Sequence, residues 1–190
     1  MTEDQSGEVL PAPEMSREIK VCDIPPKGIR MTIEPSEDEI KALMERFDLL
    51  ALKHFKAKIE IRDVGSQGIL ITGDIQAELE QTCVATGYPV AETIDESFRL
   101  RLVGEDELAL ADADEEYYLD PDSDDLDLLV GEKFDAGEVV AQTLSIMMDP
   151  YPRAEGVEIN AENIPSLTIN QDLEKQPNPF AILSGLKDKT

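Results

Sequence analysis

Few side chains in this sequence have the type and spacing that enzyme chemistry requires. The single histidine, His54, has no Cys or Asp at the spacing of a nucleophile and its base, and no phosphate-binding glycine motif is present. The two cysteines, Cys22 and Cys83, are far apart and do not have metal-site spacing. We therefore expect no enzymatic activity, no cofactor and no metal. Free thiols in a reducing compartment are favoured over a Cys22–Cys83 disulfide.

Carboxylates are the most abundant ionisable groups, and they are concentrated between residues 105 and 127. This segment has twelve acidic residues and no basic residue. Such a cluster could bind Mg²⁺ or Ca²⁺ weakly, but residues 120–127 lack the glycine and terminal glutamate of a calcium-binding loop. A nuclease would need carboxylates arranged around a divalent ion, and the sequence does not specify that arrangement.

A set of basic residues alternates with apolar ones and could form a cationic patch on the polar face of a sheet. Its members are Lys56, Lys58, Arg62, Arg99 and Arg101. A patch of this kind would be a direct RNA-binding face. Because Glu60, Asp74 and Glu78 are interleaved with it, we favour a charge-paired surface and keep RNA binding as the alternative.

The basic set belongs to a predicted three-stranded antiparallel meander at about residues 55–103. Apolar and polar residues alternate with a period of two in each strand, and turn-forming residues occupy 65–68 and 86–89. Agreement between the polar and apolar faces favours one register. The pairs expected to lie opposite each other are Lys58 with Asp74, Asp74 with Arg99, Leu79 with Ile94, and Ile75 with Phe98.

Two helices are predicted to cover the apolar face of this sheet. Ser36 and Glu39 form a capping box at the start of a helix at about 36–51, and Asp135 caps a second helix at about 135–148. Two short strands at 17–24 and 29–33, joined by a turn, precede the first helix. The expected fold class is α+β: an antiparallel sheet, two main helices, an acidic loop and an extended C-terminal tail.

The sequence predicts one folded domain with two appendages. Residues 1–15 are acidic and contain Pro11 and Pro13, which indicates a mobile N-terminal arm. Residues 16–153 are expected to form a single α+β domain. Residues 154–190 form a tail that ends in a short amphipathic helix, starting at Asn178.

Two segments combine charge with apolar residues as docking elements do. Residues 105–114 are predicted to be a solvated, partly mobile loop, whereas the tyrosine pair favours an ordered strand or loop at 115–127. The terminal helix would present an apolar stripe to its own domain or to a partner. The candidate partner-binding residues are Glu115, Glu116, Tyr117, Tyr118, Asp120, Phe180, Leu183 and Leu186.

The charge balance limits the possible partners. Forty-two acidic and seventeen basic residues give a formal net charge of −25, which opposes binding to naked nucleic acid because that binding depends on Lys and Arg. A basic protein is the partner that this charge favours. No apolar run has the length of a membrane span, and the N-terminus is acidic where a signal peptide is basic. We expect a cytoplasmic protein that does not contact the membrane.

Three blocks of sequence resemble the YceD family, the bacterial large ribosomal RNA subunit accumulation proteins. They are residues 73–87 with the following Pro89-Val90 and Glu96-Ser97-Phe98, the helix and Asp-Pro-Tyr-Pro-Arg within 134–153, and Asn178-Pro179-Phe180-Ala181. Many members of the family carry Cys-x-x-Cys where this chain has Cys83 and Thr86. A single thiol cannot form a tetrahedral zinc site by itself, so the departure from the family pattern supports the absence of a metal.

The resemblance implies a role in the production or stability of large-subunit ribosomal RNA, without a known enzymatic activity. Combined with the acidic charge, it predicts a non-enzymatic ribosome biogenesis factor that binds a basic ribosomal protein or assembly factor. The alternative is direct RNA binding through the Lys and Arg face of the sheet.

Overall fold

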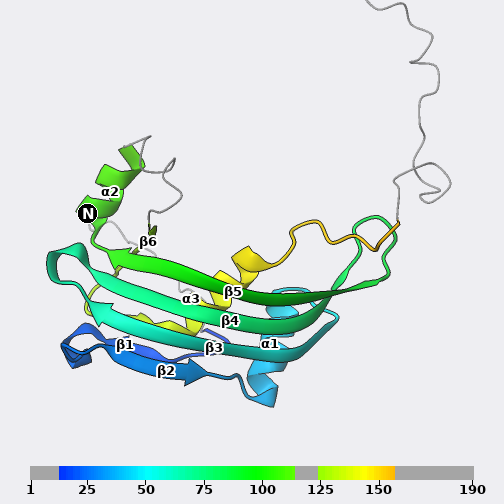
Figure 1. Ribbon diagram of the computed structural model, residues 1–190, viewed down its shortest axis with the longest axis horizontal. Helices are drawn as coiled ribbons and strands as arrows, with labels where there is room; N and C mark the ends of the chain where they lie inside the picture. The colour runs from blue at the N-terminus through cyan, green and yellow to red at the C-terminus, as the bar shows by residue number, and fades with distance from the viewer. Residues whose placement is uncertain (1–12, 114–123, 157–190) are drawn as a thin grey trace, which may run out of the picture.

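The computed structural model describes residues 13–113 and 124–156, which form a mixed α+β fold (Figure 1). The expected class is confirmed. In chain order the elements are β1 (Glu18–Lys20), the 3-10 helix η1 (Val21–Asp23), β2 (Ile29–Ile33), α1 (Glu37–Arg46), β3 (Ala51–Asp63), the 3-10 helix η2 (Gly65–Gln67), β4 (Ile69–Thr82), β5 (Pro89–Val103), α2 (Glu105–Ala113), β6 (Asp125–Leu128), β7 (Lys133–Asp135) and α3 (Ala136–Met147).

Five strands form the main sheet, in the order β2-β3-β4-β5-β6. The long strands β3, β4 and β5 pair antiparallel as the predicted meander. β6 pairs parallel to β5 at one edge, so the sheet is mostly rather than wholly antiparallel. A second, two-stranded sheet is formed by β1 and β7.

One face of the main sheet supplies most of the core. Ile61, Ile71 and Ile75 on this face are completely buried, and Leu43 of α1 and Leu144 of α3 are buried in the same cluster. In Figure 1, α1 and α3 both lie behind the sheet. The opposite face of the sheet, which we call the polar face, carries the alternating charged and hydroxyl side chains.

The two predicted N-terminal strands are present, but the first is shorter than expected because residues 21–23 form η1. The two strands do not pair with each other: β1 pairs antiparallel with β7, with Ile19 opposite Phe134, and β2 pairs with β3. A non-local tether fixes the N-terminal segment. The Asp135 carboxylate accepts hydrogen bonds from the Ser16 hydroxyl and, at 2.7 Å, from the Arg17 backbone N–H.

α1 begins at its predicted capping box but ends at Arg46, five residues before the predicted end. Asp48 adopts a left-handed backbone conformation with φ of 52°, and the Leu49 N–H donates to the Met44 carbonyl at 2.9 Å. This is the Schellman pattern of a helix C-terminus, with Asp where Gly is usual. Because no glycine marks this end, it could not be predicted from local residue types. β3 consequently starts earlier than expected, at Ala51.

The predicted strand register is right between β3 and β4 and wrong between β4 and β5. Lys58 lies opposite Asp74 as expected. Asp74, however, lies opposite Ser97 rather than Arg99. The same offset of two residues places Leu79 opposite Glu92 and Ile75 opposite Glu96.

The β4–β5 turn spans Cys83 to Tyr88, and the Cys83 N–H donates to the Tyr88 carbonyl at 2.8 Å. An even offset keeps each side chain on its own face, so the assignment of faces survives.

The first part of the acidic segment is a helix rather than the predicted loop. α2 covers Glu105–Ala113 and begins with three acidic residues, which the positive end of the helix dipole favours. The Glu107 and Leu108 N–H groups donate to the Gly104 carbonyl at 3.1 Å. Among the described residues, no helix combines the length and apolar character that crossing a membrane requires.

Candidate functional site

The candidate partner-binding residues of the acidic segment and the terminal helix fall outside the described residues. They are Glu115, Glu116, Tyr117, Tyr118, Asp120, Phe180, Leu183 and Leu186. They stay predictions. The described parts of the acidic segment are in α2 and β6, which contact each other, and β6 pairs with the end of β5.

Arg99 and Arg101, two members of the predicted basic set, are paired with the acidic segment itself. Both guanidinium groups form ion pairs with Asp124, at 3.4 Å for Arg101. Arg101 also lies 3.7 Å from a carboxylate oxygen of Glu107 in α2. The side chains of Arg101 and Asp124 are only 17% and 13% exposed, so this pairing withdraws positive charge from the surface.

The basic residues on β3 are paired in a similar way. Lys56 forms an ion pair of 2.5 Å with Glu34, and Arg62 forms one of 2.5 Å with Glu60. The hydrogen bonds from these cations hold the pKa of Glu34 and that of Glu60 below the ordinary glutamate range. Lys58 is the one member of the set without a carboxylate at ion-pair distance in the described part of the chain. The structure therefore brings the five residues to one face but neutralises four of them.

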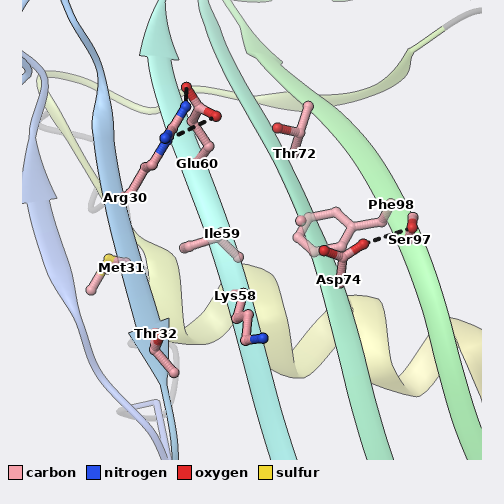
Figure 2. Close-up of a pocket in the computed structure, with 11 residues that line it drawn as sticks. Arg30, Met31, Thr32, Lys58, Ile59, Glu60, Thr72, Asp74, Ser97 and Phe98 are labelled. Atoms are coloured by element: carbon pink, nitrogen blue, oxygen red, sulfur yellow. Dashed lines mark hydrogen bonds and ion pairs between the residues drawn. The ribbon is translucent and has the colours of Figure 1, made fainter.

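A hollow of about 540 Å³ lies on the polar face around Lys58 (Figure 2). Two rows of side chains border it across the strands, Arg30-Glu60-Thr72 and Thr32-Lys58-Asp74-Ser97. Four of its polar side chains pair with each other within the hollow. Arg30 pairs with Glu60 at 3.3 Å, and the Ser97 hydroxyl donates to Asp74 at 2.7 Å. Because both signs of charge are present and mostly paired, the hollow does not select an anionic ligand.

Catalytic groups are not assembled in the described residues. His54 is exposed on β3, opposite Glu78, and no group of three or more His, Cys, Asp or Glu residues in the described ranges is arranged to hold a metal ion. Cys83 is 2% exposed at the β4–β5 turn. Hydrogen bonding from the Thr86 hydroxyl, and then from the Ala154 backbone N–H, lowers the Cys83 pKa to about 7 against the effect of burial.

Sequence reasoning missed a group of exposed aromatic and apolar residues at the β4–β5 turn. Val84, Tyr88 and Tyr151 are 52%, 71% and 70% exposed. The Val84 N–H donates to the Pro152 carbonyl at 2.9 Å, which fixes the segment after α3 beside the turn. The sequence presents Tyr88-Pro89 as a turn and Tyr151-Pro152 as a helix stop. Only the repeated Tyr-Pro pair could have drawn attention to them.

In a comparison with known families, the family model described as Large ribosomal RNA subunit accumulation protein YceD matches residues 71–187. The chain belongs to the YceD family. The name of the family implies a role in the accumulation of large-subunit ribosomal RNA. The YceD match begins inside β4 and so omits β2, α1 and β3, which complete the core in this chain. Neither the curated proteins nor the solved structures yielded a match.

Proposed function

We propose that this YceD-family protein is a non-enzymatic factor that supports large-subunit ribosomal RNA by binding a basic ribosomal protein or assembly factor. The observation that carries this proposal is the distribution of charge. Four of the five residues of the predicted basic set are engaged by carboxylates, while the whole chain keeps a net charge of −25. A surface with this excess attracts cationic proteins and repels phosphate.

The test compares two probes with the full-length chain at low and high ionic strength. One probe is the protein fraction extracted from purified large ribosomal subunits, and the other is protein-free large-subunit ribosomal RNA. We expect capture of basic proteins that weakens as salt screens the charges, and no measurable shift of the RNA. Capture that ignores ionic strength would contradict the proposal.

The same experiment distinguishes the alternative functions. Salt-sensitive RNA binding that is lost in Lys58→Glu, the member of the basic set without an ion pair in the described residues, would establish the polar face as an RNA-binding surface instead. The matched control is Lys27→Glu, which makes the same charge change at an exposed position in the turn before β2. Cleavage of the RNA that requires a divalent metal would show an enzyme.

A further inference from the structure

We infer that the β4–β5 turn and the segment after α3 form a docking surface for a basic, apolar-anchored segment of a partner protein. This surface, the hairpin-end patch, consists of Val84, Tyr88, Pro89, Pro150 and Tyr151, all of which are exposed. The inference rests on the proposed function and assigns a location to the binding of the basic partner.

The exposed aromatic side chains of the described residues are confined to the hairpin-end patch. Phe55 is 4% exposed, and Phe47, Phe98 and Phe134 pack against the core. By contrast, Tyr88 and Tyr151 are about 70% exposed, and they lie on two backbone segments that hydrogen bond to each other. Exposed tyrosines of this kind are enriched among the residues that dominate binding energy at protein interfaces, because a rigid ring offers large contact area at low entropic cost.

The patch is held in place before any partner arrives. The Asp149 N–H donates to the Glu92 carboxylate at 3.0 Å, and the Gln81 amide donates to the Asp149 carbonyl at 3.1 Å. The Tyr151 N–H in turn donates to the Asp149 side chain at 2.8 Å. These hydrogen bonds fix the segment after α3 to both β4 and β5. A pre-organised surface loses less conformational entropy when it binds.

Charge selects the occupant of the patch. The carboxylates of Glu92 and Asp149 belong to its hydrogen-bonded frame, and Glu155 is exposed nearby in sequence, whereas Arg153 is the basic residue of the same segment. A partner segment that alternates Arg or Lys with apolar residues would place cations near these carboxylates and over the tyrosine rings. Its apolar side chains would cover Val84 and the prolines. An RNA strand could stack on tyrosine, but its phosphates would face the same carboxylates.

The experiment uses the full-length, ¹⁵N-labelled chain and three synthetic peptides of equal length. One alternates Arg with Leu, one alternates Arg with Ser, and one alternates Glu with Leu. We expect the Arg-Leu peptide to bind most tightly and to shift the backbone amide signals of residues 83–88 and 149–154. The double variant Tyr88→Ser/Tyr151→Ser should bind it about tenfold more weakly, the equivalent of about 1.4 kcal/mol. The control Val130→Ser, at an apolar residue 74% exposed outside the patch, should bind like the wild type.

Several results would overturn the inference. The first is that the Arg-Leu and Arg-Ser peptides bind with equal affinity, and the second is that the amide signals shift only in α2 and β6. The third is that the double variant binds the Arg-Leu peptide as tightly as the wild type does and has the same unfolding midpoint. A single-stranded RNA oligonucleotide that shifts the same amides more strongly than the Arg-Leu peptide would also overturn it. So would a change in the free-protein signals of Val84 and Tyr88 when residues 178–190 are deleted, because the chain's own end would then be the occupant.

Capture of large-subunit proteins separates the failure of this inference from the failure of the proposed function. If the double variant captures them as well as the wild type does, the patch is not the docking surface, although the proposed function stands. If the wild-type chain binds the Arg-Leu peptide at the patch but captures no large-subunit protein, the surface stands and the proposed function fails.

Discussion

Gly73 lies in the middle of β4, where neighbouring strands leave no room for a side chain. A Cβ atom there would be 2.6 Å from the Lys58 carbonyl oxygen, 2.8 Å from Ile59 Cγ2 and 3.0 Å from Phe98 Cε1. The carbonyl belongs to the β3 backbone and cannot rotate away. We therefore expect Gly73→Ala to lower the free energy of unfolding by about 1–3 kcal/mol in urea denaturation, as overpacking does.

The control for this prediction is Gly104→Ala. No heavy atom lies within 4 Å of the added Cβ at Gly104, so no overpacking is expected there. The free energy of unfolding should fall by about 1 kcal/mol at most, because glycine is preferred to alanine at the start of a helix. A Gly73→Ala protein as stable as the wild type would show that β3 and β4 can move apart far enough to admit the added methyl group at little cost.

Glu39 links α1 to the N-terminal segment and makes folding sensitive to acid. The hydrogen bond from Arg17, at 2.7 Å, is the main reason that the Glu39 pKa falls to about 2, and hydrogen bonds from Ser36 add to it against the effect of burial. A folded-state pKa below the unfolded value of 4.5 stabilises the protein above pH 4.5, and this stabilisation is lost as the pH falls toward about 2.

Glu39→Gln should therefore reduce the free energy of unfolding by about 1–3 kcal/mol at neutral pH. It should also flatten the decline of stability between pH 4.5 and pH 2. Urea denaturation over this pH range measures both effects. Glu37→Gln, an exposed neighbour in the same first turn, controls for the loss of one charge near the helix dipole. An equal flattening in both variants would exclude the Arg17 contact as the cause.

At the scale of elements, Asp135 joins β1, β7 and α3. Its carboxylate caps α3 by accepting from the Gly137 and Glu138 N–H groups at 2.9 and 3.1 Å, and it also binds Ser16 and Arg17. Asp135→Ala should cost about 2 kcal/mol or more, since a cap alone is worth about 1 kcal/mol and the partly buried Arg17 N–H would lose its acceptor.

The comparison variant for Asp135 is Ser36→Ala. It removes the cap of α1 but leaves the tether intact, that is, the hydrogen bonds of Asp135 with Ser16 and Arg17. Its expected cost is about 1 kcal/mol. Hydrogen exchange should also accelerate at the β1 and β7 amides in Asp135→Ala only. If Asp135→Ala cost no more than Ser36→Ala, the tether would contribute nothing to stability.

These elements also show which features can be predicted from the sequence. Local signals were sufficient for the starts of α1 and α3 and for the β3–β4 register, because capping residues and alternating side chains are encoded within a few positions. Non-local contacts were not predictable: β1 pairs with β7 through Asp135, and β6 adds to β5 in parallel. The same limit applies to the basic set. Its residues were found by alternation, but their partners Glu34 and Asp124 lie outside the meander.

At the scale of the whole molecule, the core extends beyond the residues that match the YceD model. The match covers residues 71–187, yet Leu43, Phe55 and Ile61 lie before it and are at most 4% exposed. Burial of each such side chain contributes about 1.5–3 kcal/mol, whereas a domain has about 5–15 kcal/mol of net stability. Losing the three would remove about 4.5–9 kcal/mol, an amount comparable with that net stability. The side chains of β4 that pack against them would also become exposed.

We therefore expect the fragment 71–187 not to fold, because β4 would become an unpaired edge and its buried Ile71, Ile75 and Leu79 would face solvent. A chain that starts at Pro13 should retain a single cooperative transition. Urea denaturation followed by circular dichroism compares the two. The chain from Pro13 is the control, because it is also truncated but keeps every helix and strand of the described residues. Cooperative unfolding of the 71–187 fragment would show that β4, β5 and α3 form an independent core, and that β2, α1 and β3 are additions to it.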